Sequence, residues 1–266
     1  MDIMDDELPD DRISEMFRSA DADIIVRSFD NVIFQMHECN LQSVADRFLQ
    51  DDETSDDWLL SLPESGAVLE VLFRFVYPRP LPDLEKLEFE DLLLVAEAAE
   101  KYRFFSAKYA CQLALRKYCS SHTMQILRFA CEHHVYSLIT HLPQSFLIDT
   151  PLMEVSEILP SYVHQFWGGY REHWLELLHG VMSRSIPSQI FEHDTSCEGV
   201  NVPSSKIVLQ IVRDVDRPSS LLSPRLDEIF EKRFMNACGC CRRFLFEWKN
   251  VIKTEVAGMP PFVIPE

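Results

Sequence analysis

Two short runs of β-branched and aromatic residues, separated by a turn dipeptide, constrain the fold of this chain more than any other feature. The runs are residues 23–29 and 32–36, and Asp30 and Asn31 lie between them. Residues of these types favour strands, and Asp followed by Asn favours a tight turn, so the segment predicts a β-hairpin. Because an isolated hairpin is only marginally stable in water, the elements around it must cover one of its faces.

Helical periodicity predicts most of those covering elements. Residues 12–20 are expected to form a short helix, because Ile13, Met16, Phe17 and Ala20 fall at i, i+3, i+4 and i+7. A third strand is expected at 58–62, and Ser65 is a suitable N-cap for the helix that follows it. The remaining helices are expected at 37–48, 88–102, 106–118, 121–133, 134–142, 150–158, 160–167 and 169–184, with two more in 224–257.

These elements predict an α+β fold with a small three-stranded sheet wrapped by helices, followed by an all-α region. The expected organisation is an acidic disordered tail at 1–11, a first domain at 12–118, a helical region at 119–186, a polar linker at 187–205 and a C-terminal helical region at 206–266. The length of 266 residues is enough for two ordinary domains with their own cores.

The element order and several motifs of residues 12–118 resemble those of a BTB/POZ domain. The similar motifs are Ala-Asp-Ile-Ile-Val at 22–26, Phe-Gln-Met-His at 34–37, Phe-Val-Tyr at 75–77, and Leu-x-x-Ala at 93–96 followed by Tyr102, Ala107 and Cys111. The whole chain also resembles the BTB proteins that are numerous in filamentous and mushroom-forming fungi, which carry a helical C-terminal half with a late C-x-x-C. The resemblance implies a protein-binding module that often dimerises through its first helix.

The same resemblance implies a set of partner-binding residues. They are Ile13, Met16 and Phe17 on the first helix, with Asp23 and His37 at opposite ends of the hairpin. Two alternatives stay open: the apolar stripe folds back onto its own core, and the two polar residues make local hydrogen bonds instead of partner contacts.

One departure from the family pattern bears on function. BTB domains that bind cullins usually place an extra helix with a hydrophobic-x-Glu motif after the second helix. Here the corresponding text is Leu49-Gln50-Asp51, inside a short acidic segment. A role as substrate adaptor of a cullin ubiquitin ligase is therefore disfavoured.

The cysteines raise a second alternative, a zinc-stabilised regulatory protein. Cys238 and Cys241 form a C-x-x-C pair, and His193 and Cys197 would complete four ligands. Zinc requires about four such ligands in tetrahedral geometry. The spacing of the second pair is unusual, so buried, reduced thiols in a helical core are the favoured interpretation, and no cofactor is expected.

Charge and the motifs that are missing exclude several functional classes. The formal net charge is −18, which disfavours nucleic-acid and membrane partners. The sequence contains no P-loop, G-x-G-x-x-G, G-x-S-x-G or H-E-x-x-H motif, so neither catalysis nor a small-molecule substrate is expected. With no signal peptide or apolar span, we expect reduced thiols and an intracellular location, in cytoplasm or nucleus. The prediction is a non-catalytic adaptor or scaffold that binds proteins, including itself as a homodimer.

Overall fold

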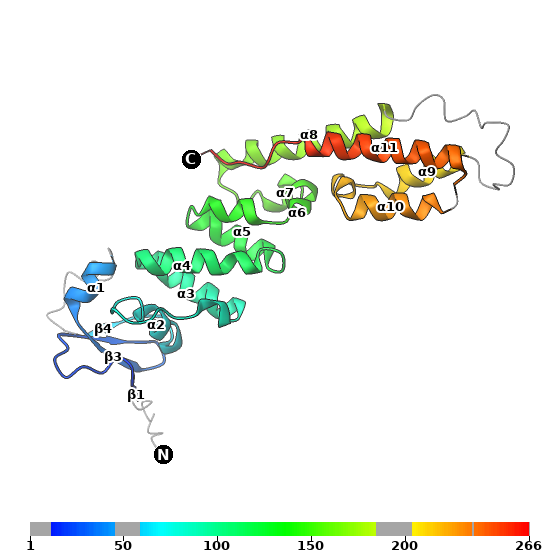
Figure 1. Ribbon diagram of the computed structural model, residues 1–266. Helices are drawn as coiled ribbons and strands as arrows, with labels where there is room; N and C mark the ends of the chain where they lie inside the picture. Colours follow the sequence, from blue (N-terminus) through cyan, green and yellow to red (C-terminus); the bar gives the residue numbers. More distant parts are fainter. Residues whose placement is uncertain (1–11, 46–58, 185–203, 236, 266) are drawn as a thin grey trace, which may run out of the picture. The chain divides into compact units, whose positions relative to one another are not determined.

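The computed structural model describes residues 12–45, 59–184, 204–235 and 237–265 of the chain. It divides into two compact units, residues 1–122 and 123–266, which we call unit 1 and unit 2 and describe separately (Figure 1). The predicted acidic tail, the acidic segment that contains Leu49-Gln50-Asp51 and most of the 187–205 linker lie outside the described residues.

Unit 1 contains a four-stranded sheet and a set of helices. Its elements are β1 (Arg12–Ile13), β2 (Ile24–Arg27), β3 (Val32–Met36), α1 (Glu38–Val44), β4 (Leu59–Ser61), α2 (Gly66–Phe73), the 3₁₀ helix η1 (Leu84–Lys86), α3 (Phe89–Lys101), α4 (Phe105–Leu115) and the 3₁₀ helix η2 (Arg116–Tyr118).

The predicted hairpin is confirmed. Strands β2 and β3 pair antiparallel, with Val26 opposite Phe34. In the turn, Asn31 adopts a φ of 60°, in the left-handed region that Asn tolerates better than most residues. Alternate residues of both strands are buried, so one face of the sheet packs against the core.

The first segment of unit 1 corrects the sequence-based prediction. Residues 12–20 do not form a helix. Instead β1 pairs parallel with β3 as a fourth strand, and the sheet order is β1-β3-β2-β4. The backbone N–H of Arg12 donates to the carbonyl of Asn31 at 3.1 Å, and that of Ser14 donates to the carbonyl of Ile33 at 2.8 Å. The open edge of the hairpin thus supplies backbone partners that an isolated short helix lacks.

Asp30 ties the hairpin to the start of α2. Its Oδ1 accepts hydrogen bonds from the Ser28 hydroxyl at 2.7 Å and from the backbone N–H of Gly66 at 2.6 Å. The Ser28 hydroxyl and, to a smaller extent, the Gly66 N–H lower the pKa of Asp30 below its ordinary value, against the opposing effect of burial. Ser65 caps the same helix end by accepting from Val68 N–H at 3.4 Å, which confirms the predicted N-cap.

We expect Gly66→Ala to lower the free energy of unfolding by about 1–3 kcal/mol, because the new methyl group overpacks this junction. A Cβ at Gly66 would lie 2.4 Å from Val32 Cγ2 and 2.8 Å from Val32 Cβ. The control is Gly168→Ala, where a Cβ meets nothing within 4 Å inside a helix. That change should stabilise the protein by about 0.5–1 kcal/mol. Urea unfolding measures both, and equal stabilities for the two variants would contradict the packing described.

An aromatic cluster forms the centre of unit 1. It consists of four buried phenylalanine side chains, those of Phe17, Phe34, Phe73 and Phe104. The ring centres of Phe34 and Phe73 lie 5.1 Å apart in an edge-to-face arrangement. Helix α3 packs against both α2 and α4. Strand and helix residues from distant parts of the sequence therefore share one core.

The described residues of unit 2 contain helices and turns but no strand. Its elements are α5 (Thr123–Glu132), the 3₁₀ helix η3 (Tyr136–His141), α6 (Gln144–Asp149), α7 (Leu152–Val155), α8 (Ser161–Arg184), α9 (Ser204–Asp214), the 3₁₀ helix η5 (Pro218–Leu221), α10 (Arg225–Phe234) and α11 (Gly239–Ala257). The two helices expected in 224–257 are confirmed as α10 and α11. The helix expected at 134–142 is a 3₁₀ helix, which corrects that prediction.

Helix α8 corrects a further prediction. A break was expected at Gly168 and Gly169, yet the helix runs without interruption from Ser161 to Arg184. Trp167 and Trp174 on this helix are 1% and 0% exposed. Each buried aromatic side chain contributes a few kcal/mol, which outweighs the helix penalty of about 1 kcal/mol per glycine. The protein is thus α+β in unit 1 and all-α across the described part of unit 2.

Candidate protein-interaction surface

Strand β1 and the segment that follows it present two apolar side chains to solvent. Ile13 is 40% exposed and Met16 is 39% exposed. Ser14, which lies between them, and Phe17, which follows Met16, are both buried. Strand β1 lies at one edge of the sheet, so its outer side has no neighbouring strand among the described residues. We call Ile13 and Met16 the edge pair. Apolar side chains at an open sheet edge are typical of surfaces that bind another chain.

Phe17 does not belong to this surface, which corrects its prediction as a partner-binding residue. Only 3% of it is exposed. The centre of its ring lies 5.9 Å from the ring centres of Phe34 and Phe73 and 6.1 Å from the ring centre of Tyr77. Because residues 15–17 form a bend and not a helix, the side chains of Met16 and Phe17 are not held on one helical stripe. The open alternative, that the stripe folds onto its own core, therefore holds for Phe17 and not for the edge pair.

Arg79 holds the backbone beside the edge pair. Its Nη1 donates to the carbonyl of Met16 at 3.3 Å, and its guanidinium lies 5.6 Å from the centre of the Tyr77 ring. The backbone N–H of Gln35 donates to the carbonyl of Phe17 at 2.8 Å. The Met16 side chain is consequently presented from a backbone fixed on both sides.

His37 lies at the centre of a polar chain that ends in solvent. Its backbone N–H donates to the Tyr77 hydroxyl at 3.2 Å, and its Nδ1 lies 3.0 Å from the same oxygen. Its Nε2 lies 3.4 Å from Asp21 Oδ1. If the Tyr77 hydroxyl donates to Nδ1, the ring proton rests on Nε2 and faces the carboxylate. The Ser19 hydroxyl, followed by the Asp21 backbone and His37, lowers the pKa of Asp21.

Asp23 has a local role at the start of α1. Its Oδ1 accepts a hydrogen bond from the backbone N–H of Glu38 at 2.7 Å, one of the N–H groups that the first turn of a helix leaves unpaired. Asp23 and His37, which sequence analysis placed at opposite ends of the hairpin, are brought to the same end, because Ile24 pairs with Met36. Both thus have intramolecular hydrogen bonds.

Sequence analysis missed three residues of this area: Asp21, Tyr77 and Arg79. Tyr77 is 40 positions from His37 in the chain, so no local spacing joins them. The only signal was that Tyr77 ends a helical pattern immediately before Pro78. A polar aromatic side chain at the end of a buried helix often reaches a partner with its hydroxyl.

The predicted zinc ligands are only partly described by the structure. His193 and Cys197 lie outside the described residues. Cys238 and Cys241 are each 9% exposed and belong to the hydrophobic cluster of unit 2. Cys238 is the N-cap residue of α11, and its Sγ accepts a hydrogen bond from the Cys241 N–H at 3.5 Å. This arrangement gives the C-x-x-C spacing a helix-capping role, and the zinc site stays a prediction.

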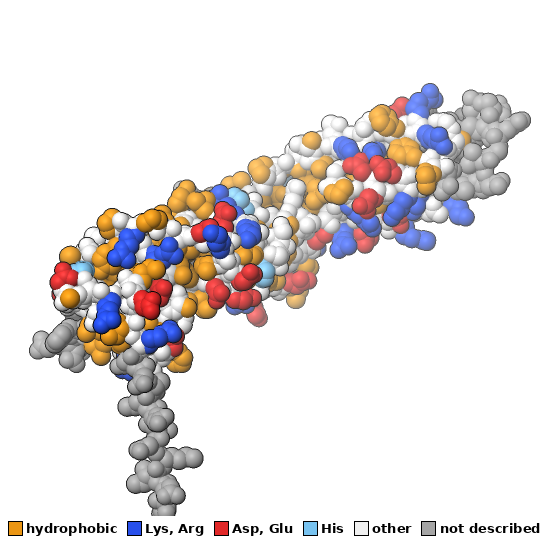
Figure 2. All heavy atoms as spheres, turned by 60° about the horizontal axis from the view of Figure 1, so that its bottom comes forward, with side chains coloured by type: hydrophobic (Ala, Val, Ile, Leu, Met, Phe, Trp, Pro, Cys, Tyr) orange, Lys and Arg blue, Asp and Glu red, His pale blue; other side chains and the backbone are white. Residues whose placement is uncertain are grey.

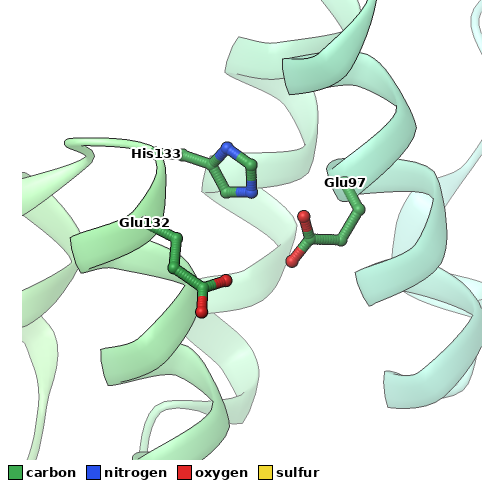
Figure 3. Close-up of side chains that lie close together, drawn as sticks. All are labelled: Glu97, Glu132 and His133. Atoms are coloured by element: carbon green, nitrogen blue, oxygen red, sulfur yellow. The ribbon is translucent and has the colours of Figure 1, made fainter. Parts of the chain in front are cut away.

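Figure 3 labels three further residues with ligand atoms, and they belong to different units. Glu97 lies on α3 of unit 1, whereas Glu132 and His133 follow one another at the end of α5 of unit 2. Glu132 pairs with Arg128 at 4.0 Å, and the His133 ring packs 4.8 Å from Phe129. Taken alone, neither unit gathers three His, Cys or carboxylate ligands among its described residues. We therefore assign no metal centre within either unit.

Two buried thiols, those of Cys111 and Cys131, are poor nucleophiles. Burial, with a smaller contribution from Glu100, raises the pKa of Cys111 to about 12. Burial likewise raises the pKa of Cys131 to about 11, with a smaller contribution from Glu132. Because the thiolate is the reactive form, neither residue suits thiol catalysis at neutral pH.

The charged side chains visible in Figure 2 are mixed. On the face shown, basic, acidic and hydrophobic side chains alternate over the described residues, and the basic ones do not gather in one broad patch. A continuous basic patch is the usual footprint of a nucleic-acid interface. The face shown in Figure 2 therefore has no such footprint.

Neither a protein-family model nor a curated protein matches this chain. Among the described helices, none combines the length and the hydrophobicity needed to cross a membrane.

Proposed function

We propose that this chain is a non-catalytic adaptor or scaffold whose unit 1 is a BTB/POZ-like domain. From β2 onward the order of elements supports the proposal: a hairpin, a helix, another strand and then a series of helices, whereas β1 stands in place of the first helix that the resemblance implies. The motif at 22–26 runs into β2, the motif at 34–37 covers the end of β3, and the motif at 75–77 follows α2. The proposed activity is self-association through unit 1.

The observation that carries the proposal is the edge pair. Ile13 and Met16 are exposed apolar side chains on a backbone that β3 and Arg79 hold in place. In a twofold dimer each chain buries the same surface, so four such side chains are covered. At about 1 kcal/mol each for partly exposed side chains, they contribute about 4 kcal/mol to association, and a dimer at tens of micromolar requires a further ~3 kcal/mol from other contacts of the same edge. Backbone groups on the outer edge of β1 offer further hydrogen bonds to a partner strand.

Size-exclusion chromatography with light scattering tests the proposal through the variant Ile13→Ser/Met16→Ser. We expect this variant to be a folded monomer at a concentration where the unaltered chain is a dimer. The matched control is Phe29→Ser, which removes a 78% exposed aromatic side chain from the hairpin turn of the same unit. The control should keep the mass of the unaltered chain, and a dimeric double variant would contradict the proposal.

A further inference from the structure

A groove lies between α8 and the C-terminal end of α11, two helices of unit 2 whose backbones are labelled in Figure 1. Its volume is about 470 Å³, which is within the usual size range of ligand clefts. Its apolar lining comes from Leu177, Val181, Met259 and Pro260, and Glu176 and Glu255 lie on its rim. We call this the α8–α11 groove.

The groove continues along the exposed side of α8. A second hollow, lined by Glu172, Leu175, Glu176 and His179, shares Glu176 with the first. These residues recur at helical spacings of three and four, so they lie on one face of the helix. From Glu172 to Val181 the axis rises by about 13 Å, which matches two to three turns of a second helix laid alongside.

The charged groups of the groove are all of one sign. Glu172, Glu176 and Glu255 are exposed, and none of them forms an ion pair with another described residue. The lining contains His173 and His179 but neither Lys nor Arg. Carboxylates without internal partners favour a cationic ligand.

The nearest positive charges on α11 are engaged elsewhere. Lys249 and Lys253 pair with Asp227 of α10, with Nζ to Oδ1 distances of 2.8 and 2.7 Å. The Ser223 hydroxyl donates to the same carboxylate at 2.8 Å. The two lysines, in that order, and then Ser223 hold the pKa of Asp227 far below its ordinary value. These lysines are thus fixed on the α10 side of α11, and the groove carboxylates stay available.

We propose that the α8–α11 groove binds a short amphipathic helix of a partner protein that carries Lys or Arg beside an apolar stripe. The apolar side chains of the partner would pack on Leu177, Met259 and Pro260, which are half-buried or exposed, and methionine adapts to varied shapes. Its cations would meet Glu176 and Glu255. A metal ion is a poorer fit, because no three ligand atoms of the described groove residues converge. The groove gives the adaptor a second surface that is independent of the edge pair.

Fluorescence anisotropy with the full chain tests the proposal. The probe is a labelled designed helix of Leu and Lys residues, and its Leu and Glu counterpart is the reference. We expect the cationic peptide to bind and the anionic peptide not to bind. The variant Glu176→Gln/Glu255→Gln should weaken binding about fivefold, because each exposed ion pair contributes roughly 0.5 kcal/mol.

The control variant changes the net charge by the same amount as the groove variant, but at residues outside the groove lining. Glu231→Gln/Glu247→Gln removes two exposed carboxylates from α10 and α11 and should leave affinity within about twofold. Gly180→Leu, which adds an apolar side chain to the groove lining without altering charge, should abolish binding while circular dichroism stays unchanged.

Equal weakening by the two double variants would mean that the acidic chain attracts cations without a specific site, and would overturn the proposal. Full binding by Gly180→Leu would also overturn it. Neither outcome depends on the mass of the chain in solution, so failure of the groove and failure of self-association are distinguishable.

Discussion

Replacing Phe17 by alanine is expected to lower the free energy of unfolding by about 3–5 kcal/mol, whereas Met16→Ala should change it by less than about 0.5 kcal/mol. The two residues are adjacent in sequence. Phe17 is 3% exposed and contacts the rings of Phe34, Phe73 and Tyr77, so its removal leaves a cavity in the core. Met16 is 39% exposed, and its backbone interaction with Arg79 survives truncation.

Urea unfolding monitored by circular dichroism measures this difference. The comparison distinguishes the bend at residues 15–17 of the structure from the amphipathic helix that the sequence suggests. On one helical stripe both side chains would be covered together, and the two variants would lose similar stability. Similar losses for Phe17→Ala and Met16→Ala would therefore contradict the placement of this segment.

Replacing Lys108 by methionine is expected to cost about 3 kcal/mol of stability. Lys108 Nζ lies 2.7 Å from Glu100 Oε2, and the Glu100 side chain is only 6% exposed. Gln112 Nε2 donates to the other carboxylate oxygen at 3.3 Å. Without the lysine, a nearly buried carboxylate keeps one weak neutral partner, and its desolvation is no longer offset.

Two further variants show whether burial of Glu100 is the cause. Lys86→Met breaks the Lys86–Asp83 pair, whose side chains are 82% and 52% exposed, and should cost less than about 1 kcal/mol. The double variant Glu100→Gln/Lys108→Met removes the unpaired charge and should recover part of the loss. Thermal or urea unfolding gives all three values. A loss as small for Lys108→Met as for Lys86→Met would rule out this explanation.

The sequence predicted the parts of the fold whose signals are local. The hairpin follows from its strand residues and from Asp30 and Asn31, and the start of α2 follows from Ser65. The helix predicted at 12–20 was wrong. An i, i+3, i+4 pattern does not reveal that the backbone of β3 offers an open edge, with which β1 pairs. The helix break predicted at the glycines of α8 was wrong for a similar reason. The burial of Trp167 and Trp174, which stabilises the continuous helix, depends on tertiary contacts that the local sequence does not show.

The candidate surface was predicted in part for the same physical reason. Ile13 and Met16 were predicted to bind a partner, and both are exposed, whereas Phe17 of the same predicted stripe is buried. Tyr77 was missed as the partner of His37, because the two meet only when α2 packs on the sheet. The α8–α11 groove had no sequence signal, because its two carboxylates, Glu176 and Glu255, come from helices far apart in the chain.

Sedimentation equilibrium of the unaltered chain tests the central claim most directly, because it measures mass without assuming a shape. The account predicts a mass that rises with concentration to twice the chain mass of 30.9 kDa at tens of micromolar. A constant mass of one chain over that whole concentration range would contradict self-association through the edge pair.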